Sequence, residues 1–268
     1  MSLSRHCRRP RPRSAGRPTR DLTAYDLYLR ALALTSSARQ FPKALGLLER
    51  AIARDPQYGP ALAQAAICCV RLVIDGRSKD PNADALKGAD FARRALEVAG
   101  DDPFILASAA QALAYFGEDI GAMMTLVDRA LSLNPNFARG WHISGALRMW
   151  SGEHEIAIEH LEAALRLSPR ARVGSSLAFI GRAHFLGRRF DEAVPKLILA
   201  IQEDSSYPEP YRTLASCYAH MGRLDEARQV ERLRTITPVV VPKTTPYRDA
   251  GQRELYLSGL RLAAGEAK

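Results

Sequence analysis

Apolar residues spaced three and four positions apart form two consecutive stripes within residues 140–169, GWHISGALRMWSGEHEIAIEHLEAALRLSP. This spacing predicts two amphipathic helices, and Gly152 between the stripes predicts a tight turn. Gly145 on the first stripe and Ala157 on the second mark where two helix backbones would approach closely. Pro169 is expected to end the second helix, because proline lacks an N–H donor. A hairpin of this kind cannot bury its apolar faces alone, so we expect copies stacked on either side of it.

The same arrangement recurs along the chain in three aligned columns of small residues. Two columns repeat at spacings of 35, 36 and 34 residues, and a column of turn glycines repeats every 35 residues. At the turn glycines we expect positive backbone φ angles between the paired helices. The columns consist of Ala110, Gly145, Gly181 and Ala215; of Ala122, Ala157, Ala193 and Ala227; and of Gly117, Gly152, Gly187 and Gly222.

The period and the residues at fixed positions resemble the tetratricopeptide repeat, whose length is 34 residues. The resemblance implies an all-α fold, a tetratricopeptide-type α-solenoid of about six helical hairpins with a C-terminal capping helix. It is carried in one unit by Trp141, Gly145, Ala157, Ala164 and Pro169, and in the last complete unit by Tyr211, Tyr218 and Ala227.

Composition shifts along the chain divide it into segments. Residues 1–20 lack apolar periodicity and read as a disordered, arginine-rich leader, and residues 21–237 carry the repeats. An excess of about ten residues in the second unit falls near 73–84, where Gly, Pro, Asn and Asp predict an exposed loop. Such a loop is either a contact site or, more commonly, a tolerated insertion. Prolines predict an extended strap at 238–247, and spaced leucines predict a C-terminal helix at 248–264.

The net charge of +9 suggests nucleic acid binding until the charges are located. Residues 1–20 contain seven arginines and no acidic residue, so the leader carries +7 and the rest of the chain only +2. A basic arm on a nearly neutral body would give salt-sensitive binding to nucleic acid by the arm alone. We therefore do not expect nucleic acid to be the main partner.

No pattern of catalytic or cofactor-binding residues stands out. His154 and His160 are six residues apart, which places them on different sides of a helix, unlike the four-residue spacing of a zinc-binding motif. The four cysteines lack metal-ligand spacing, and we find no phosphate-binding loop and no nucleophile elbow. No apolar run is long enough for a membrane span. We therefore expect a non-enzymatic cytoplasmic protein without cofactor or metal.

What remains as a candidate site is the inner surface of the solenoid. The first helix of each pair usually lines the concave side of such an array. Arginines and aromatic rings there would suit an extended peptide, with acidic or aromatic side chains, from a protein partner. The tetratricopeptide register places these residues inward: Gln111, Tyr115, Arg139, His142, Trp150, Ser175, Arg182, Glu209, Arg212 and His220.

Three segments carry a narrower resemblance. They read AYDLYLRALAL near the start, NPNFARGWHISGALRMWSGEHEIAIEHLEAALRLSP in the middle and YRDAGQRELYLSGLRLAAG near the end. They are similar to the repeat-bearing C-terminal half of bacterial class III adenylate cyclase-like regulators. That resemblance implies an alternative function, the detached regulatory or sensory half of a signalling protein. Cyclase activity does not carry over, because the family's catalytic domain precedes the repeats and only the leader of 1–20 does so here.

Overall fold

The fold is all-helical in a computed structural model that describes residues 21–35, 38–170, 173–237, 239–242 and 245–265. No strand occurs in these ranges. The leader of 1–20, with its seven arginines, lies outside them. None of the helices within the described ranges is both long enough and apolar enough to cross a membrane.

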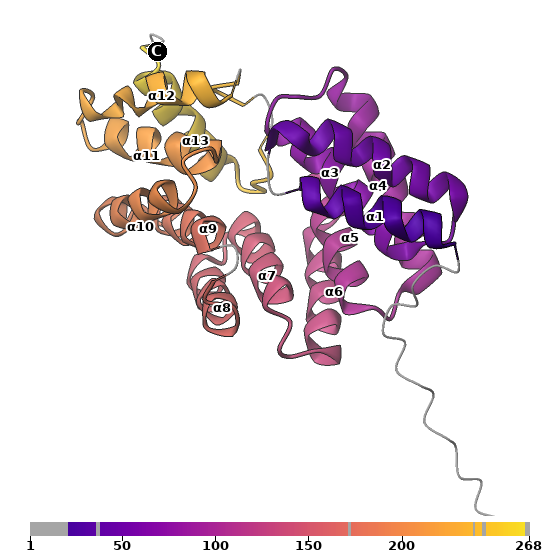
Figure 1. Cartoon of the computed structure of the whole chain (residues 1–268). Coiled ribbons are helices and arrows are strands. Elements are labelled where there is room, and N and C mark those ends of the chain that lie inside the picture. The colour runs from indigo at the N-terminus through magenta and orange to yellow at the C-terminus, as the bar shows by residue number, and fades with distance from the viewer. Residues whose placement is uncertain (1–20, 36–37, 171–172, 238, 243–244, 266–268) are drawn as a thin grey trace, which may run out of the picture.

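The helices pair into six successive hairpins and leave a single helix at the C-terminal end (Figure 1). The last hairpin pairs one long helix with a 3₁₀ turn (η2, Glu226–Arg228) and a short helix, and another 3₁₀ turn (η1, Ala38–Gln40) lies inside the first. The α-helices are α1 (Leu22–Leu34), α2 (Phe41–Arg54), α3 (Gly59–Ile74), α4 (Pro81–Ala99), α5 (Pro103–Tyr115), α6 (Ile120–Leu133), α7 (Ala138–Ser151), α8 (His154–Leu167), α9 (Val173–Leu186), α10 (Phe190–Glu203), α11 (Pro208–His220), α12 (Gln229–Ile236) and α13 (Ala250–Ala263).

Because glycine has no side chain, the paired helices can approach closely at these positions, as the columns of small residues predicted. A Cβ atom added at Gly145 would lie 2.6 Å from Cγ of Leu161 and 2.9 Å from the backbone oxygen of Ala157. At Gly181 the corresponding distance to Cγ of Leu197 is 2.7 Å. These positions require glycine, because any larger residue would push the two helices apart.

The turns confirm three of the four predicted left-handed glycines. Gly117, Gly152 and Gly222 have φ angles of 103°, 98° and 74°. The prediction for Gly187 is wrong by one residue, because the positive φ of that turn, 59°, lies at Arg188. The spacing of 36 residues between Gly145 and Gly181 is one residue longer than the spacing of 35 between the turn glycines, which accounts for this shift.

The second hairpin absorbs its additional length mainly in its helices. With 16 and 19 residues, α3 and α4 are the two longest helices of the described chain. The connection between them is residues 75–80, which is shorter than the exposed loop expected at 73–84. Its first residue, Asp75, is buried.

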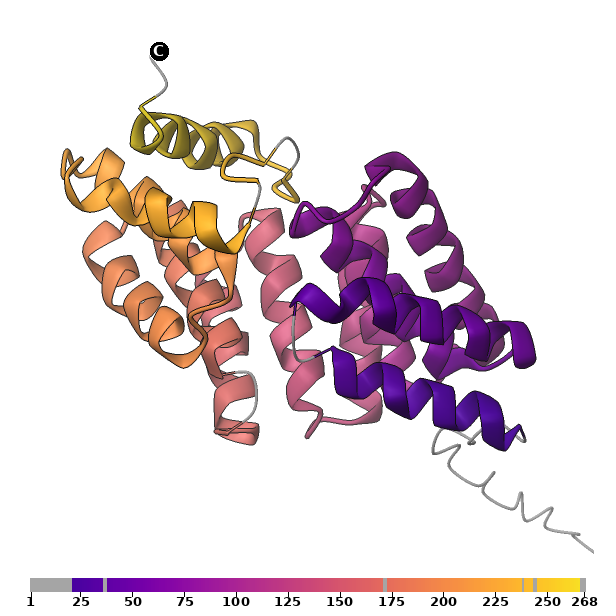
Figure 2. The ribbon, with the colours of Figure 1, turned by 45° about the horizontal axis from the view of Figure 1, so that its top comes forward.

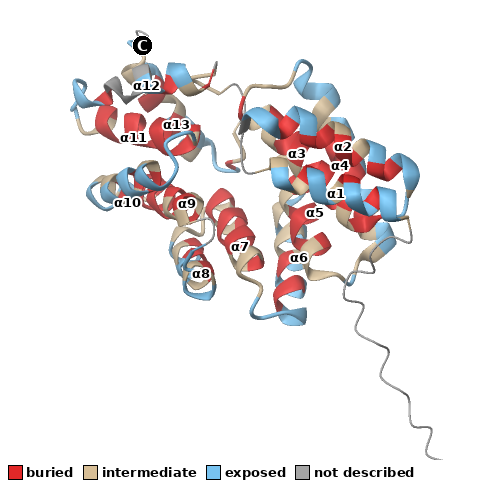
Figure 3. Ribbon diagram, viewed as in Figure 1, coloured by how far each residue is buried: buried red, intermediate tan, exposed pale blue. Residues whose placement is uncertain are grey.

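Two contiguous clusters of buried apolar side chains hold the array together. One extends from α1 to α5 and the other from α5 to α13, and α5 contributes to both. From the second hairpin on, the first helix of each pair is more buried than the second, as Figure 3 shows for α5, α7, α9 and α11. In the first hairpin the order is reversed, and α2 is more buried than α1. The hairpins stack in the same orientation, so their first helices lie on the inner side of a curved array. Figure 2 shows this array from a second direction.

The C-terminal helix α13 packs on α11. Gly259 allows this, because a Cβ atom there would collide with Oγ of Ser216 and with the ring of His220. Nε2 of His220 donates a hydrogen bond to the backbone oxygen of Leu255 at 2.7 Å. The helix thus covers the inner side of the last hairpin.

The described residues before α13, 239–242 and 245–249, lie across the middle of the array, and we call them the strap. The backbone N–H of Arg248 donates to the carbonyl oxygen of Trp150 at 3.0 Å. Its guanidinium donates to the carbonyl oxygens of Ala114 and Glu118 at 2.7 and 2.8 Å. The strap therefore ties the C-terminal end of the chain to the ends of α5 and α7.

The close approach at Gly145 predicts the outcome of a matched pair of substitutions. Gly145→Val should lower the free energy of unfolding by about 1–3 kcal/mol, because the added methyls collide with α8. Gly46→Val should change it by less than about 0.5 kcal/mol, because no atom lies within 4 Å of the added Cβ. Urea unfolding followed by circular dichroism measures both. Equal effects would show that the helix pair does not need a small residue.

The strap contacts predict a local effect of Arg248→Ala. Loss of a charged donor to two carbonyl oxygens should raise hydrogen exchange at the amides of 245–249 roughly tenfold, since such bonds contribute about 1.5–3 kcal/mol. Exchange in α8 should stay unchanged. Arg253→Ala, an exposed arginine on α13, is the control. Unchanged exchange at 245–249 would mean that Arg248 does not anchor the strap.

Candidate functional site

The concave side of the array contains a cavity of about 820 Å³. Its walls come from the inner helices α3, α5, α7, α9 and from the start of α11. The strap and Tyr256 of α13 close one side. The cavity is therefore formed by residues that are far apart in the sequence and that only the curvature of the array brings together.

Most of the predicted groove residues line this cavity. They come from α5, α7, α9 and α11, as the repeat register implied. Gln111 and Tyr115 on α5 and Arg139 on α7 are half-buried, whereas His142 is buried. Those that line it are Gln111, Tyr115, Arg139, His142, Trp150, Ser175, Arg182 and Glu209.

Two of the predicted residues do not line the cavity. Arg212 is 0% exposed, and its guanidinium donates to the backbone oxygen of Val239 in the strap at 2.6 Å. His220 lies under α13, where it bonds the backbone of Leu255. Both positions point inward as predicted, but the chain's own C-terminal segment occupies the space in front of them.

A buried ion network forms the C-terminal wall of the cavity. Glu209, in the first turn of α11, is paired with Arg182 from α9 and with Arg212 one turn further along α11. Burial alone would raise the pKa of Glu209, but the two guanidinium charges outweigh it and lower the pKa to about 2. The carboxylate therefore stays ionised and its arginines stay paired at neutral pH.

This network continues to the other end of the array. Next to Arg212, the hydroxyl of Thr237 donates to the backbone oxygen of Asp75 at 3.1 Å. Asp75 is ion-paired with Arg71 of α3 at 3.2 Å. The guanidinium of Arg71 lies 5.5 Å from the ring centroid of Tyr207, at the start of α11. The second and the last hairpin are thus joined across the concave side.

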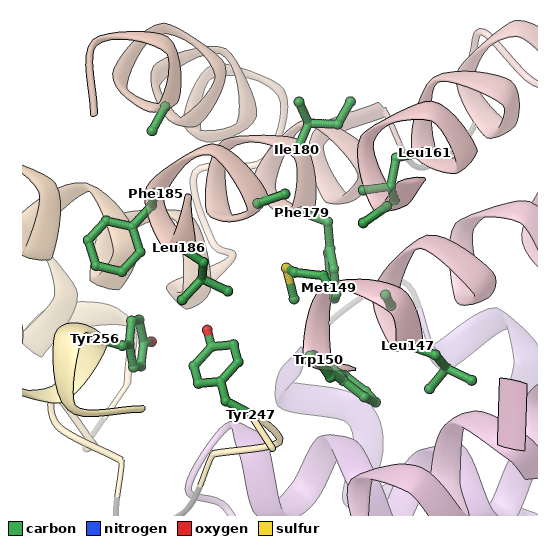
Figure 4. Packing of buried hydrophobic residues seen from close by; sticks show 14 of the residues in the cluster. Leu147, Met149, Trp150, Leu161, Phe179, Ile180, Phe185, Leu186, Tyr247 and Tyr256 are labelled. Carbon is green, nitrogen blue, oxygen red and sulfur yellow. The ribbon is translucent and has the colours of Figure 1, made fainter. Parts of the chain in front are cut away.

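Aromatic rings form much of the remaining wall. Tyr247 of the strap lies between Tyr256 and Trp150 in Figure 4, and the centroids of the two tyrosine rings are 5.6 Å apart. Burial raises the pKa of Tyr247 to about 12. Trp150 also packs edge-on against Tyr115, with ring centroids 6.2 Å apart. The rings give the cavity an apolar surface with a few polar atoms set into it.

Further polar side chains line the wall formed by α7 and α9. Nδ1 of His142 lies 3.0 Å from the hydroxyl of Ser176, and Nε2 lies 3.5 Å from that of Ser175. The guanidinium of Arg139 lies 5.0 Å from the ring centroid of Phe104. Within the described ranges, no group of three or more His, Cys, Asp or Glu side chains is placed to hold a metal ion.

The sequence alone did not reveal some lining residues. Arg71 lies in the most degenerate hairpin, where the repeat register is hardest to assign. Tyr207 precedes its helix, outside the helical stripe, and Tyr247 lies in the strap. The one available signal was the segment YRDAGQRELYLSGLRLAAG, which begins at Tyr247 and contains Arg248 and Tyr256.

Comparison with known proteins agrees with the helical-repeat geometry. The family model described as tetratricopeptide repeat matches residues 185–230. These residues contain the end of α9, all of α10 and α11, and the turns that follow. No curated protein matches the chain in sequence.

Solved structures share the fold at low sequence identity. A tetratricopeptide repeat protein from Parabacteroides merdae has a TM-score of 0.50 at 15% identity, covering 91% of this chain and 88% of that one. PilW, a type IV pilus biogenesis factor, has a TM-score of 0.56 at 14% identity, covering 80% and 94%. The human IFIT1 dimer with m7Gppp-AAAA has a TM-score of 0.65 at 17% identity, and this chain covers half of it. The family model thus matches one part of the chain, and the solved structures share its helical-repeat fold.

Proposed function

We propose that this chain is a non-catalytic tetratricopeptide repeat scaffold that binds a protein or peptide partner through its concave surface. The observation that carries the proposal is the cavity of about 820 Å³ on that surface, lined by arginine and aromatic side chains. PilW, a structural neighbour, is described as a pilus biogenesis factor, which fits a role for this fold in assembly.

The lining indicates the chemistry of the partner. Gln111 and Arg139 are half-buried at the cavity, so their polar ends can still meet a ligand. A carboxylate on the partner would form charge-assisted hydrogen bonds with Arg139. Its apolar side chains would pack against Tyr115 and Trp150. We therefore propose a partner segment that combines acidic with aromatic or aliphatic side chains.

The buried arginines have a different role in this proposal. Arg182 and Arg212 neutralise Glu209 and hold the strap, so they shape the site and Arg139 recognises the partner. Substituting all three arginines together would mix loss of folding with loss of binding. Arg139 alone is the informative position.

The narrower resemblance to class III adenylate cyclase-like regulators stays a prediction. Under it, the chain is the sensory half of a bacterial cytoplasmic signalling protein. The tail segment that carries the resemblance forms the end of the strap and α13, which close the cavity. We further propose the divisions at 21–237 for the array, 238–247 for the strap and 248–264 for the last helix.

Selection of displayed random dodecapeptides on the purified full chain tests the proposal. We expect the enriched peptides to combine Asp or Glu with aromatic or aliphatic residues. Synthetic copies should bind Arg139→Glu at least about tenfold more weakly than the unchanged protein, because the substitution places a like charge in the site. Fluorescence anisotropy measures this binding.

The control is Arg166→Glu, which makes the same charge change on the exposed face of α8. It should bind the peptides as well as the unchanged protein does. Enrichment of basic peptides, or equal weakening by both substitutions, would contradict binding at the concave surface. Thermal unfolding of both variants establishes that they are folded.

A further inference from the structure

We infer that the cavity on the concave side binds a small organic anion with an aromatic or other apolar body. This goes beyond the proposed function, because such a molecule can bind whether or not a protein partner uses the same surface. Three observations carry it: the partial enclosure of the cavity, its apolar wall and its charge.

Partial enclosure comes from the contacts that join the second and the last hairpin. Thr237 bonds the backbone of Asp75, and Arg71 lies against the ring of Tyr207. Arg248 fixes the strap to the ends of α5 and α7. A compact molecule fits between these contacts, and the volume lies within the range of about 300–1,000 Å³ that small-molecule sites have.

The apolar part of the wall comes from the second hairpin and from the strap. Ile67, Val70 and Ile74 of α3 face the cavity from one side. Residues 239–241 of the strap, three valines, face it from another. Together with the aromatic rings they would remove the body of a ligand from water, at about 25 cal/mol for each Å² buried.

The lining carries an excess of positive charge. Four arginines and one glutamate contribute to it. Glu209 balances Arg182, and Asp75, outside the lining, balances Arg71, so the lining still keeps a positive excess. A cavity with this balance, walled by apolar groups of low polarisability, favours an anion over a neutral or cationic molecule. The arginines are Arg71, Arg139, Arg182 and Arg234.

Two fluorescent probes of similar shape test the inference on the purified full chain. One is 8-anilinonaphthalene-1-sulfonate, an anion, and the other is N-phenyl-1-naphthylamine, which has the same rings without the sulfonate. We expect saturable binding of one anion per chain, about tenfold tighter than binding of the neutral probe. Isothermal titration gives the stoichiometry, and quenching of Trp150 emission by energy transfer, measured in Trp141→Phe, gives the location.

Two variants place the probe in the cavity. Arg139→Gln should weaken binding of the anionic probe about fivefold or more and leave the neutral probe unchanged. Arg166→Gln, on the exposed face of α8, should change neither. Ser175→Trp fills the cavity from α9 and should abolish binding of both probes, which keeps the test decisive if Arg139→Gln does not fold.

Equal affinity for the two probes, binding at many weak sites, or identical binding to Arg139→Gln and Arg166→Gln would overturn the inference. The probe assay contains no protein partner, so a negative result does not bear on the proposed peptide binding. A failed peptide selection, in turn, does not bear on binding of the anion.

Discussion

Glu209 lies in the first turn of α11 with its carboxylate between two guanidinium groups, and much of the architecture depends on this pairing. Arg182 brings α9 to it, and Arg212 extends it to the backbone of the strap at Val239. Removing one partner from a buried ion pair leaves an uncompensated charge, at about 3–5 kcal/mol. The network therefore holds the strap in place.

Fixing the strap changes what the concave side of the array can do. A stack of helical hairpins by itself presents an open groove, and each hairpin contacts only its neighbours. Here the strap carries Tyr247 into the curve beside Trp150, and Thr237 reaches Asp75, 162 positions earlier in the chain. The groove becomes a partly enclosed cavity, and its walls favour occupants by size as well as by charge.

Local features of the sequence predicted the repeating part of this fold. Gly145 and Gly181 could be identified because close helix packing excludes a side chain wherever the repeat places them. The inward positions on α5, α7 and α9 followed from the same register. The spacing of 36 residues between Gly145 and Gly181 already indicated that the left-handed turn would shift by one residue to Arg188. The regular column of turn glycines pointed instead to Gly187.

The register could not show which inward residues meet a ligand and which meet the chain itself. His142 and Arg212 occupy equivalent positions on their helices, but His142 lines the cavity whereas the strap covers Arg212. The path of the strap depends on contacts between residues far apart in the sequence, and prolines predicted only that it is extended. The same limit concealed Arg71 and Tyr207, whose contact exists only once the array has curved back on itself.

The central claim is that the ionised carboxylate of Glu209 holds the strap and α13 against the array. Urea unfolding of the protein and of Glu209→Gln between pH 7 and pH 2.5 tests it most directly. Because the pKa of Glu209 is lowered from 4.5 to about 2 in the folded protein, its contribution is complete above about pH 4.5 and is lost as the pH falls towards 2. The account predicts a difference in unfolding free energy of about 3 kcal/mol at pH 7 that shrinks steadily below pH 4.5. A difference that stays constant across this range, or that is absent at pH 7, would contradict it.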